Sequence, residues 1–377
     1  MRDRGIMAFD GENTLNSRII LHADMDCFYA AVEMHDYSQY VGKPVVVGAD
    51  PQGGTGRGVV STCSYEAREY GIRSAMPISQ AYRLCPDAVF LRPRMDRYAE
   101  ISEEIMDILR SPGFRFEQVS IDEAFLDMSS AGSFSRAQNV AENLKKGINT
   151  RCGITCSLGL APTKIVAKIA SDFKKPNGFT IIEPAGVPSF LAPLPVRRIP
   201  GIGDKTEKEL QILGIHTIGD LAAYDIQGLL GRFGRNAVIL HEVARGIDGS
   251  EVVERDGIKS LSKEMTFDKD TDEPGEIITA LEGMIGELGI FLVRENLFFK
   301  TVTIRIRSEG FVTKTKAKTL IHYHKDVETI RECAQELLRE LFRGAKIRRL
   351  GLRLSGLKKQ DARQRKLFSP DDSEPGD

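Results

Sequence analysis

Hydrophobic and polar positions in the first half of the chain predict short strands that alternate with helices. Residues 18–24 have the pattern of a buried strand, and the next segment, CFYAAVEMH, has that of a helix start. Two short strands, a glycine-rich loop and a helix carrying Tyr65 and Arg68 are predicted over residues 42–93. The remaining elements are helices at residues 98–110 and 136–150 and strands at residues 114–128 and in GITCSLGLAPT. This order favours a helix-backed, mainly antiparallel sheet with a small α/β subdomain.

The second half of the chain contains two further units. A proline-rich segment, EPAGVPSFLAPLPVRRIP, marks a boundary, and short helices punctuated by glycine follow to about residue 249. Residues 250–258 have the composition of a charged linker. Residues 259–356 alternate three strands (SLSKEMTF, FFKTVTIRIRS and RRLGLRLSGL) with two helical stretches. The sequence therefore predicts an α+β multidomain protein in which order fails after Leu357.

Composition narrows the class of protein. The chain has 377 residues, of which 41% are hydrophobic and 28% charged, so a fibrous or disordered protein is excluded. The N-terminus lacks an apolar signal segment, and no apolar run is long enough to span a membrane. Six scattered cysteines lack the spacing of a zinc site and indicate reduced thiols. We therefore expect a cytoplasmic protein that neither is secreted nor enters a membrane.

The net charge of −1 hides an asymmetry. Residues 251–290 hold 4 Lys and Arg against 11 Asp and Glu, whereas residues 291–368 hold 20 against 8, a net charge of +12. A basic stretch of this size in a neutral chain indicates a local anion-binding surface for nucleic acid. A solvated face of mixed helices is the alternative.

Acidic residues stand in two of the predicted strands. Asp24 and Asp26 lie where the first strand ends, and Asp122 and Glu123 lie inside a later one. If the two strands are neighbours, their carboxylates converge on a site for divalent cations, and two such ions support phosphoryl transfer. Adjacent residues of a strand point to opposite faces, so Asp122 and Glu123 need a turn or bulge to act together. Acidic loop ends at the surface remain the alternative.

Phosphate-binding groups are predicted on two helices. The segment from Thr62 to Arg68 opens a helix with a hydroxyl near its cap, and Tyr65 and Arg68 lie three residues apart on one face. Backbone N–H groups at a helix start and a guanidinium both suit a phosphate. Lys164 and Lys168 share one face of a later helix. An ordinary capped helix and exposed lysines with no specific role are the alternatives.

A glycine hairpin precedes the helix that begins near residue 204. The sequence IPGIG, with Gly201 and Gly203, places a tight turn before an amphipathic segment and suits contacts to DNA phosphates. A second, weaker copy begins at LGRFG and contains Gly231 and Gly234. A plain turn between helices is the alternative for the first copy.

Five motifs occur together in a characteristic order. They are RIILHADMDCFYAAVE, STCSYEAREYGIRSAMP, VSIDEAFLD, GLAPTKIVAKIASDFKKPNG and IPGIG. In this order the sequence resembles the Y-family, lesion-bypass DNA polymerases of the DNA polymerase IV, or DinB, type, over residues 18–357. The resemblance implies a right-hand polymerase fold. Its parts are a palm (18–27 and 94–175), small fingers (28–93), a helix-hairpin-helix thumb (176–249), a linker (250–258) and an α/β little finger (259–357), between an N-terminal extension (1–17) and a disordered tail (358–377).

The resemblance also assigns roles to residues. Asp24, Asp122 and Glu123 match the catalytic, metal-binding carboxylates, with the backbone oxygen of Met25 as a further ligand. Tyr29 matches the steric gate that excludes a ribose 2′-hydroxyl. The other implied nucleotide-binding residues are Cys27, Phe28, Thr62, Tyr65, Arg68, Ala75 and Lys168. Gly201, Gly203, Gly231 and Gly234 are the implied DNA contacts of the thumb.

The function implied is template-directed, low-fidelity DNA synthesis across lesions, with two Mg²⁺ ions (or Mn²⁺ as a substitute) and without a proofreading exonuclease. Primer–template DNA and dNTPs are the expected substrates, for a monomer in a prokaryotic cytoplasm near the nucleoid. The tail sequence QRKLF, with Gln364, Leu367 and Phe368, is similar to motifs that dock in sliding clamps. A catalytically silent DNA-binding scaffold and a palm-fold nucleotidyl cyclase are the alternative functions.

Overall fold

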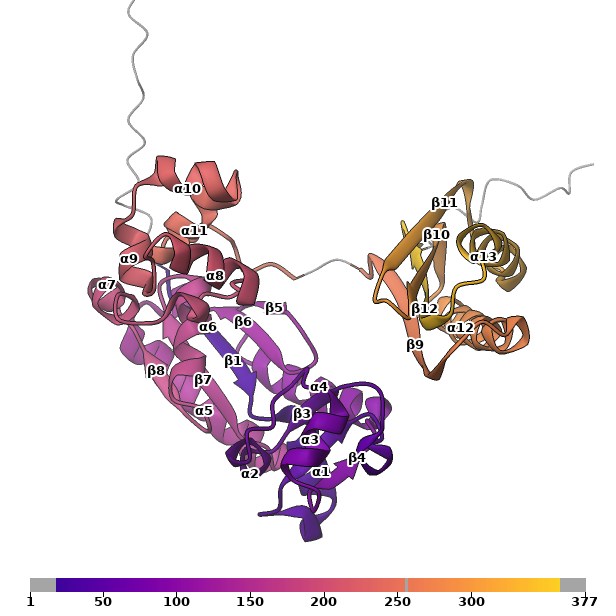
Figure 1. Cartoon of the computed structure of the whole chain (residues 1–377). Coiled ribbons are helices and arrows are strands. Elements are labelled where there is room, and N and C mark those ends of the chain that lie inside the picture. Colours follow the sequence, from indigo (N-terminus) through magenta and orange to yellow (C-terminus); the bar gives the residue numbers. More distant parts are fainter. Residues whose placement is uncertain (1–17, 255–256, 360–377) are drawn as a thin grey trace, which may run out of the picture. The chain divides into compact units, whose positions relative to one another are not determined.

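The computed structural model describes residues 18–254 and 257–359. These residues form two compact units, the first mainly from residues 18–54 and 59–254 and the second mainly from residues 257–359 (Figure 1). The segments 1–17 and 360–377, and with them Gln364, Leu367 and Phe368, lie outside the described residues.

A five-stranded sheet forms the centre of the first unit. Its order is β5-β6-β1-β7-β8, antiparallel except for the parallel pair β7 and β8. The strands are β5 (Arg115–Gln118), β6 (Glu123–Asp127), β1 (Ile20–Met25), β7 (Cys156–Ala161) and β8 (Phe179–Ile181). The single strand predicted over residues 114–128 is in fact the hairpin of β5 and β6. The sheet also continues to Ile181, past residue 175, where the palm was expected to end.

Helices cover both faces of this sheet. On one face, Leu21, Ala23 and Met25 of β1 are buried in a core shared with helices α1 (Phe28–Asp36), α4 (Met95–Arg110) and α5 (Phe134–Cys152). On the other face, Ile20 of β1 and Phe125 of β6 pack with α6 (Lys164–Phe173). Because side chains alternate along a strand, His22 and Asp24 lie on the face that α6 partly covers.

A smaller sheet belongs to the segment predicted as an α/β subdomain. Its order is β3-β2-β4, formed by β3 (Val60–Cys63), β2 (Val45–Gly48) and β4 (Val89–Leu91). Helices α2 (Tyr65–Glu69) and α3 (Ile78–Leu84) complete this segment. Ser64 caps α2, because its side chain accepts a hydrogen bond from the N–H of Ala67.

Five short helices follow: α7 (Val187–Leu191), α8 (Asp204–Ile212), α9 (Ile218–Ala223), α10 (Ile226–Phe233) and α11 (Asn236–Ala244). Gly201, with φ of +94°, forms the turn before α8, and Gly203 is the residue that precedes this helix. The second predicted hairpin is only partly present. Gly231 lies inside α10, as Gly228 does, and of the two glycines in LGRFG only Gly234, with φ of +56°, turns the chain.

The second unit has one antiparallel sheet and two helices. The strand order is β11-β10-β12-β9, and β13 pairs with β10. The elements are β9 (Ser260–Thr271), α12 (Pro274–Arg294), β10 (Leu297–Ser308), β11 (Thr313–His324), α13 (Val327–Leu341), β12 (Ile347–Ser355) and β13 (Lys358–Lys359). Val302, Ile304 and Ile306 of β10 share a buried core with residues of α12 and α13. The sheet reaches Lys359, two residues beyond the predicted end of this unit.

Candidate active site

Three acidic residues come together where β1 and β6 pair. Asp24 and Glu123 lie directly opposite each other in the antiparallel register. Asp122 precedes β6 in the hairpin turn, and its carbonyl oxygen accepts a hydrogen bond from the N–H of Met25 at 2.9 Å. Adjacent residues within a strand point to opposite faces, but Asp122 lies in the turn before β6. Its side chain therefore does not have to point away from that of Glu123. Ser120 further fixes Asp122, donating from its hydroxyl to Oδ1 at 2.5 Å.

Two lysines neutralise these carboxylates. The Nζ atom of Lys175 lies 2.7 Å from Oδ1 of Asp24, and Lys168 forms an ion pair with Oε2 of Glu123. All four side chains are partly buried, which strengthens each attraction relative to an exposed pair. The site therefore carries compensating positive charge on movable side chains beside its acidic residues.

The carboxyl groups that face each other bind protons very differently. Burial raises the pKa of Asp24 to about 6, and the charges of Asp122 and Glu123 add to this although Lys175 opposes it. A hydrogen bond from His22, together with Lys168, holds the pKa of Glu123 at about 2. Burial lowers the pKa of His22 to about 4, so its imidazole is neutral at physiological pH. Glu123 is thus always ionised there, whereas Asp24 exchanges a proton in slightly acidic solution.

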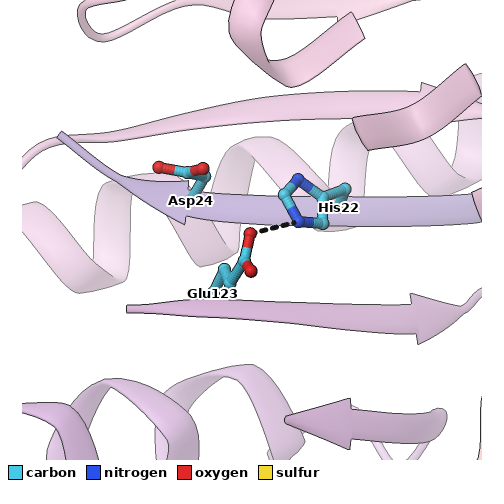
Figure 2. Close-up of side chains that lie close together, drawn as sticks. All are labelled: His22, Asp24 and Glu123. Carbon is cyan, nitrogen blue, oxygen red and sulfur yellow. Dashed lines mark hydrogen bonds and ion pairs between the residues drawn. The ribbon is translucent and has the colours of Figure 1, made fainter. Parts of the chain in front are cut away.

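The residues of this cluster fit a divalent cation. One ligand atom each from His22, Asp24 and Glu123 lies within 4.8 Å of the others (Figure 2). Carboxylate oxygens are the ligands that Mg²⁺ prefers, and Asp24 and Glu123 each bring one to this group. His22 is fully buried, and its two ring nitrogens are hydrogen-bonded to Ser171 and Glu123. We therefore do not count His22 among the ligands of a cation.

Asp26 has a different role from Asp24, although the two lie only two residues apart at the end of β1. Its buried carboxylate accepts hydrogen bonds from the hydroxyls of Thr155 and Ser157, each at 2.8 Å, and from the N–H of Asn177 at 2.8 Å. The Tyr65 hydroxyl also donates to it, at 3.4 Å. Asp26 therefore ties β1 to β7, to α2 and to the loop that carries Lys175.

Two stacked aromatic rings, Tyr29 of α1 and Tyr98 of α4, lie next to the acidic cluster. The rings of Tyr29 and Tyr98 are parallel, with centroids 4.4 Å apart and an angle of 11° between their planes. Tyr98 is fully buried, and its hydroxyl donates to Glu33 at 2.5 Å. Glu33 in turn pairs with Arg94 at 2.9 Å. The partly exposed ring of Tyr29 consequently rests on a partner that is fixed from behind.

The residues expected to bind phosphate are partly brought together. The guanidinium of Arg68 lies over the ring of Tyr65, 4.4 Å from its centroid, so these two side chains do share a face of α2. Thr62 belongs to the preceding strand β3, and Cys27, with φ of +41°, is the residue before α1. Lys168, on α6, forms an ion pair with Glu123.

Three segments of the chain match one protein family. Residues 23–172 match the impB/mucB/samB family, residues 258–367 match its C-terminal domain, and residues 184–215 match the HHH motif of the IMS family. DNA polymerase IV of Methanoculleus marisnigri is 50% identical, over 93% of this chain and 98% of the relative. DNA polymerase IV 2 of Methanosarcina mazei is 45% identical, over 94% and 96%.

Solved structures agree with these sequence relatives. A chimera of the Y-family DNA polymerases Dbh and Dpo4 superimposes with a TM-score of 0.81 at 30% identity, covering 91% of this chain and 100% of the chimera. The chain belongs to the Y family of DNA polymerases. DinB from Sulfolobus solfataricus is also similar to this Y-family chain, with a TM-score of 0.61 and 31% identity over 89% of this chain and 98% of that one.

Membership in the Y family confirms the resemblance stated from the five motifs. It also confirms the polymerase fold and the enzyme class of DNA-directed DNA polymerase. In the part of this polymerase that the structure describes, no helix is both long and apolar enough to cross a membrane.

Sequence reasoning missed three side chains of the Y-family site. Lys175 was inside a quoted motif, KKPNG, but only the fold reveals that it pairs with Asp24. Tyr98 is far from Tyr29 in sequence and stacks on it through α4. His22 stood two residues before Asp24, and this spacing on a strand could have placed both on one face.

Proposed function

We propose that this Y-family polymerase extends a DNA primer on a template strand and continues past template lesions. The observation that carries the proposal is the meeting of Asp24, Asp122 and Glu123 at the paired strands β1 and β6. This is the arrangement that two-metal phosphoryl transfer requires, and it lies in a chain whose relatives are named DNA polymerase IV.

The three carboxylates and the backbone oxygen of Met25 are the groups we assign to metal binding. Two Mg²⁺ ions, or Mn²⁺ in their place, would supply Lewis-acid stabilisation of the attacking and leaving oxygens when bound. Glu123 serves better as a ligand than as a general base, because its pKa of about 2 makes it a poor proton acceptor. Arg68, Tyr65, Thr62 and the residues around Cys27 and Phe28 form the proposed dNTP-binding surface.

Lys168 and Lys175 are well placed to help with a triphosphate. Each ammonium group forms an ion pair with one carboxylate of the acidic cluster. With Asp24 and Glu123 engaged in metal binding, the ammonium groups of Lys168 and Lys175 would be free to contact the phosphate oxygens of a triphosphate. In this proposal Tyr29 excludes ribonucleotides. Ala75 has a small side chain and therefore leaves room near the incoming base.

We further propose that the open face of the second sheet binds the DNA backbone. Arg305 and Arg307 of β10 alternate with the buried core residues of that strand, and Arg349 and Arg353 of β12 do the same. Arg305 and Arg353 line a hollow of about 340 Å³ on this face, together with small polar residues such as Ser260 and Ser262. Guanidinium groups in such a row favour phosphates over bases. Gly201, Gly203 and Gly234 would add backbone contacts.

The proposed domains follow from these pieces. The palm comprises residues 18–27 and 94–175 with β8 added, the fingers 28–93, the thumb 176–249 apart from β8, and the little finger 259–357 with β13 added.

A sliding clamp is the proposed partner of Gln364, Leu367 and Phe368, for a monomeric enzyme in the cytoplasm. Removing residues 360–377 should abolish clamp binding in a pull-down, and retained binding would rule this partner out.

Primer extension on undamaged and abasic templates tests the proposal. We expect the wild-type chain to extend a labelled primer with dNTPs and Mg²⁺ on both templates, and to leave a mismatched primer undigested because we assign no exonuclease. A folded chain that binds DNA without extending the primer would support the scaffold alternative. Formation of a cyclic nucleotide from a single nucleoside triphosphate would support the cyclase alternative.

A further inference from the structure

The imidazole of His22 lies behind the acidic cluster and is fully buried. Its Nδ1 atom is 2.8 Å from the hydroxyl of Ser171 on α6, and its Nε2 atom is 3.2 Å from Oε2 of Glu123 (Figure 2). The ring also packs against Phe125, with centroids 4.4 Å apart. The ring therefore connects α6 on one side with Glu123 on the other.

The chemistry of the carboxylate sets the direction of the hydrogen bond to Glu123. A carboxylate can only accept, so Nε2 of His22 carries the proton and donates it to Oε2. The other ring nitrogen, Nδ1, is then unprotonated and accepts a hydrogen bond from the Ser171 hydroxyl at 2.8 Å. Helix α6 thus fixes the ring at one nitrogen, and the ring fixes one oxygen of Glu123.

His22 and Lys168 contact the same oxygen but hold it in different ways. Lys168 reaches Oε2 with a flexible side chain that is 31% exposed, so it can leave when other charges enter the site. His22 has no exposed surface and is enclosed by β1, Phe125 and α6, so it cannot move away. Only His22 offers a donor that stays in place while the charge of the site changes.

We propose that His22 is a positioning residue of this polymerase, whose N–H holds Oε2 of Glu123 so that Oε1 is presented to a divalent cation. The inference rests on the proposed function, because it assigns metal binding to Glu123. His22 does not act as a metal ligand itself, since both ring nitrogens already have partners within the fold. Substituting a residue that orients a metal ligand commonly lowers metal affinity or activity by about 10- to 100-fold.

A pair of substitutions separates positioning from packing. In His22→Gln the side-chain amide nitrogen reaches the place of Nε2 and can still donate to Glu123. In His22→Asn the amide reaches only the place of Nδ1 and leaves Glu123 without this donor. Both variants remove the aromatic ring, so a loss that comes from packing alone affects both and follows their melting temperatures.

The measurement is Mn²⁺ binding, followed by electron paramagnetic resonance with a dideoxy-terminated primer–template and a dNTP, alongside single-turnover incorporation. We expect His22→Asn to weaken Mn²⁺ binding and to slow incorporation by about 10- to 100-fold, and His22→Gln to restore most of both. The dissociation constant for DNA should stay unchanged in each variant.

Equal behaviour of the two variants would overturn the proposal, whether both match the wild type or both lose metal binding to the same extent. The metal titration also separates this proposal from the proposed function. A wild-type chain that fails to extend primers would refute the polymerase function, while the contrast between Gln and Asn in Mn²⁺ binding would still decide the role of His22.

Discussion

At the scale of single residues, the site places two carboxyl groups of opposite character next to each other. Asp24 is buried deeply enough that its pKa rises to about 6, whereas the donors around Glu123 lower its pKa to about 2. As proposed metal ligands, Glu123 is ionised throughout the physiological range, whereas Asp24 must lose a proton once the solution is more acidic than about pH 6. If these two residues bind the metal as we propose, we expect metal binding to depend on pH.

Lowering the pH should weaken Mg²⁺ binding through Asp24. Below about pH 6 the folded protein holds a proton on Asp24, and a cation must displace it. The Mg²⁺ concentration for half-maximal incorporation should stay level above about pH 7 and then rise by up to about tenfold for each pH unit below 6. Rates measured in Mg²⁺ titrations between pH 5 and 8 provide the test. A half-maximal concentration that does not change over that range would contradict the burial of Asp24.

Tyr29→Ala should admit ribonucleotides. Removing the ring leaves room for a 2′-hydroxyl, so we expect discrimination between dNTP and rNTP to fall by about 10² or more in kcat/KM. Tyr98→Phe is the matched control, because it keeps the ring that stacks on Tyr29 and loses only the hydroxyl that donates to Glu33. Unchanged discrimination in Tyr29→Ala would remove the gate from this residue.

The residues that the sequence could identify are those that lie close together along the chain. Asp24 and Glu123 belong to short motifs and were predicted correctly as neighbours, although their strands had first to be assumed adjacent. Lys175 and Tyr98 could not be assigned, because each acts through a contact that only the fold brings about. For His22, strand spacing could indicate the face it shares with Asp24, but not its contact with Glu123. Contacts between distant segments leave no trace in local spacing.

At the scale of elements, the sequence predicts best where one face is apolar. Strand β10 was predicted because Val302, Ile304 and Ile306 alternate with polar residues. Strand β11 was missed, since it lies at the edge of its sheet and most of its side chains are exposed lysines, threonines and histidines. The turn between β5 and β6 was also hidden, because the segment around Asp122 contains no glycine or proline.

An acidic residue, Glu264, lies among the arginines on the open face of the second sheet. Glu264 of β9 accepts from Arg305 at 3.4 Å and from Arg349 at 3.1 Å, and so occupies guanidinium groups that we assign to DNA. Because these pairs are partly exposed, each contributes at most about 1 kcal/mol. Their loss should cost the fold little.

Glu264→Gln should therefore tighten DNA binding by about three- to fivefold and steepen its dependence on salt, as two arginines become free for phosphates. Glu287→Gln is the control, since it removes the same charge from helix α12, where Glu287 pairs with Lys263. Fluorescence anisotropy of a labelled primer–template at several salt concentrations measures both. Equal effects of the two variants would show that only net charge matters.

At the scale of the whole molecule, we propose that this nearly neutral chain keeps nucleotidyl transfer and binding of the DNA backbone in different units. The first unit holds the acidic cluster, and the second holds most of the basic stretch whose net charge is +12. A polymerase needs both, because carboxylates that bind metal also repel the DNA backbone. The motifs led to the expectation of several units, while the ends of the sheets at Ile181 and Lys359 depend on strand pairing that no motif records.

The central claim is that Glu123, with Asp24 and Asp122, carries nucleotidyl transfer. The direct measurement is single-turnover incorporation of one correct dNTP in saturating Mg²⁺ by the wild type, Glu123→Gln and Asp127→Asn, which changes another acidic residue of β6. We expect Glu123→Gln to lose on the order of 10³-fold in rate with DNA binding intact, and Asp127→Asn to stay close to the wild type. Incorporation by Glu123→Gln within about tenfold of the wild-type rate would contradict the account.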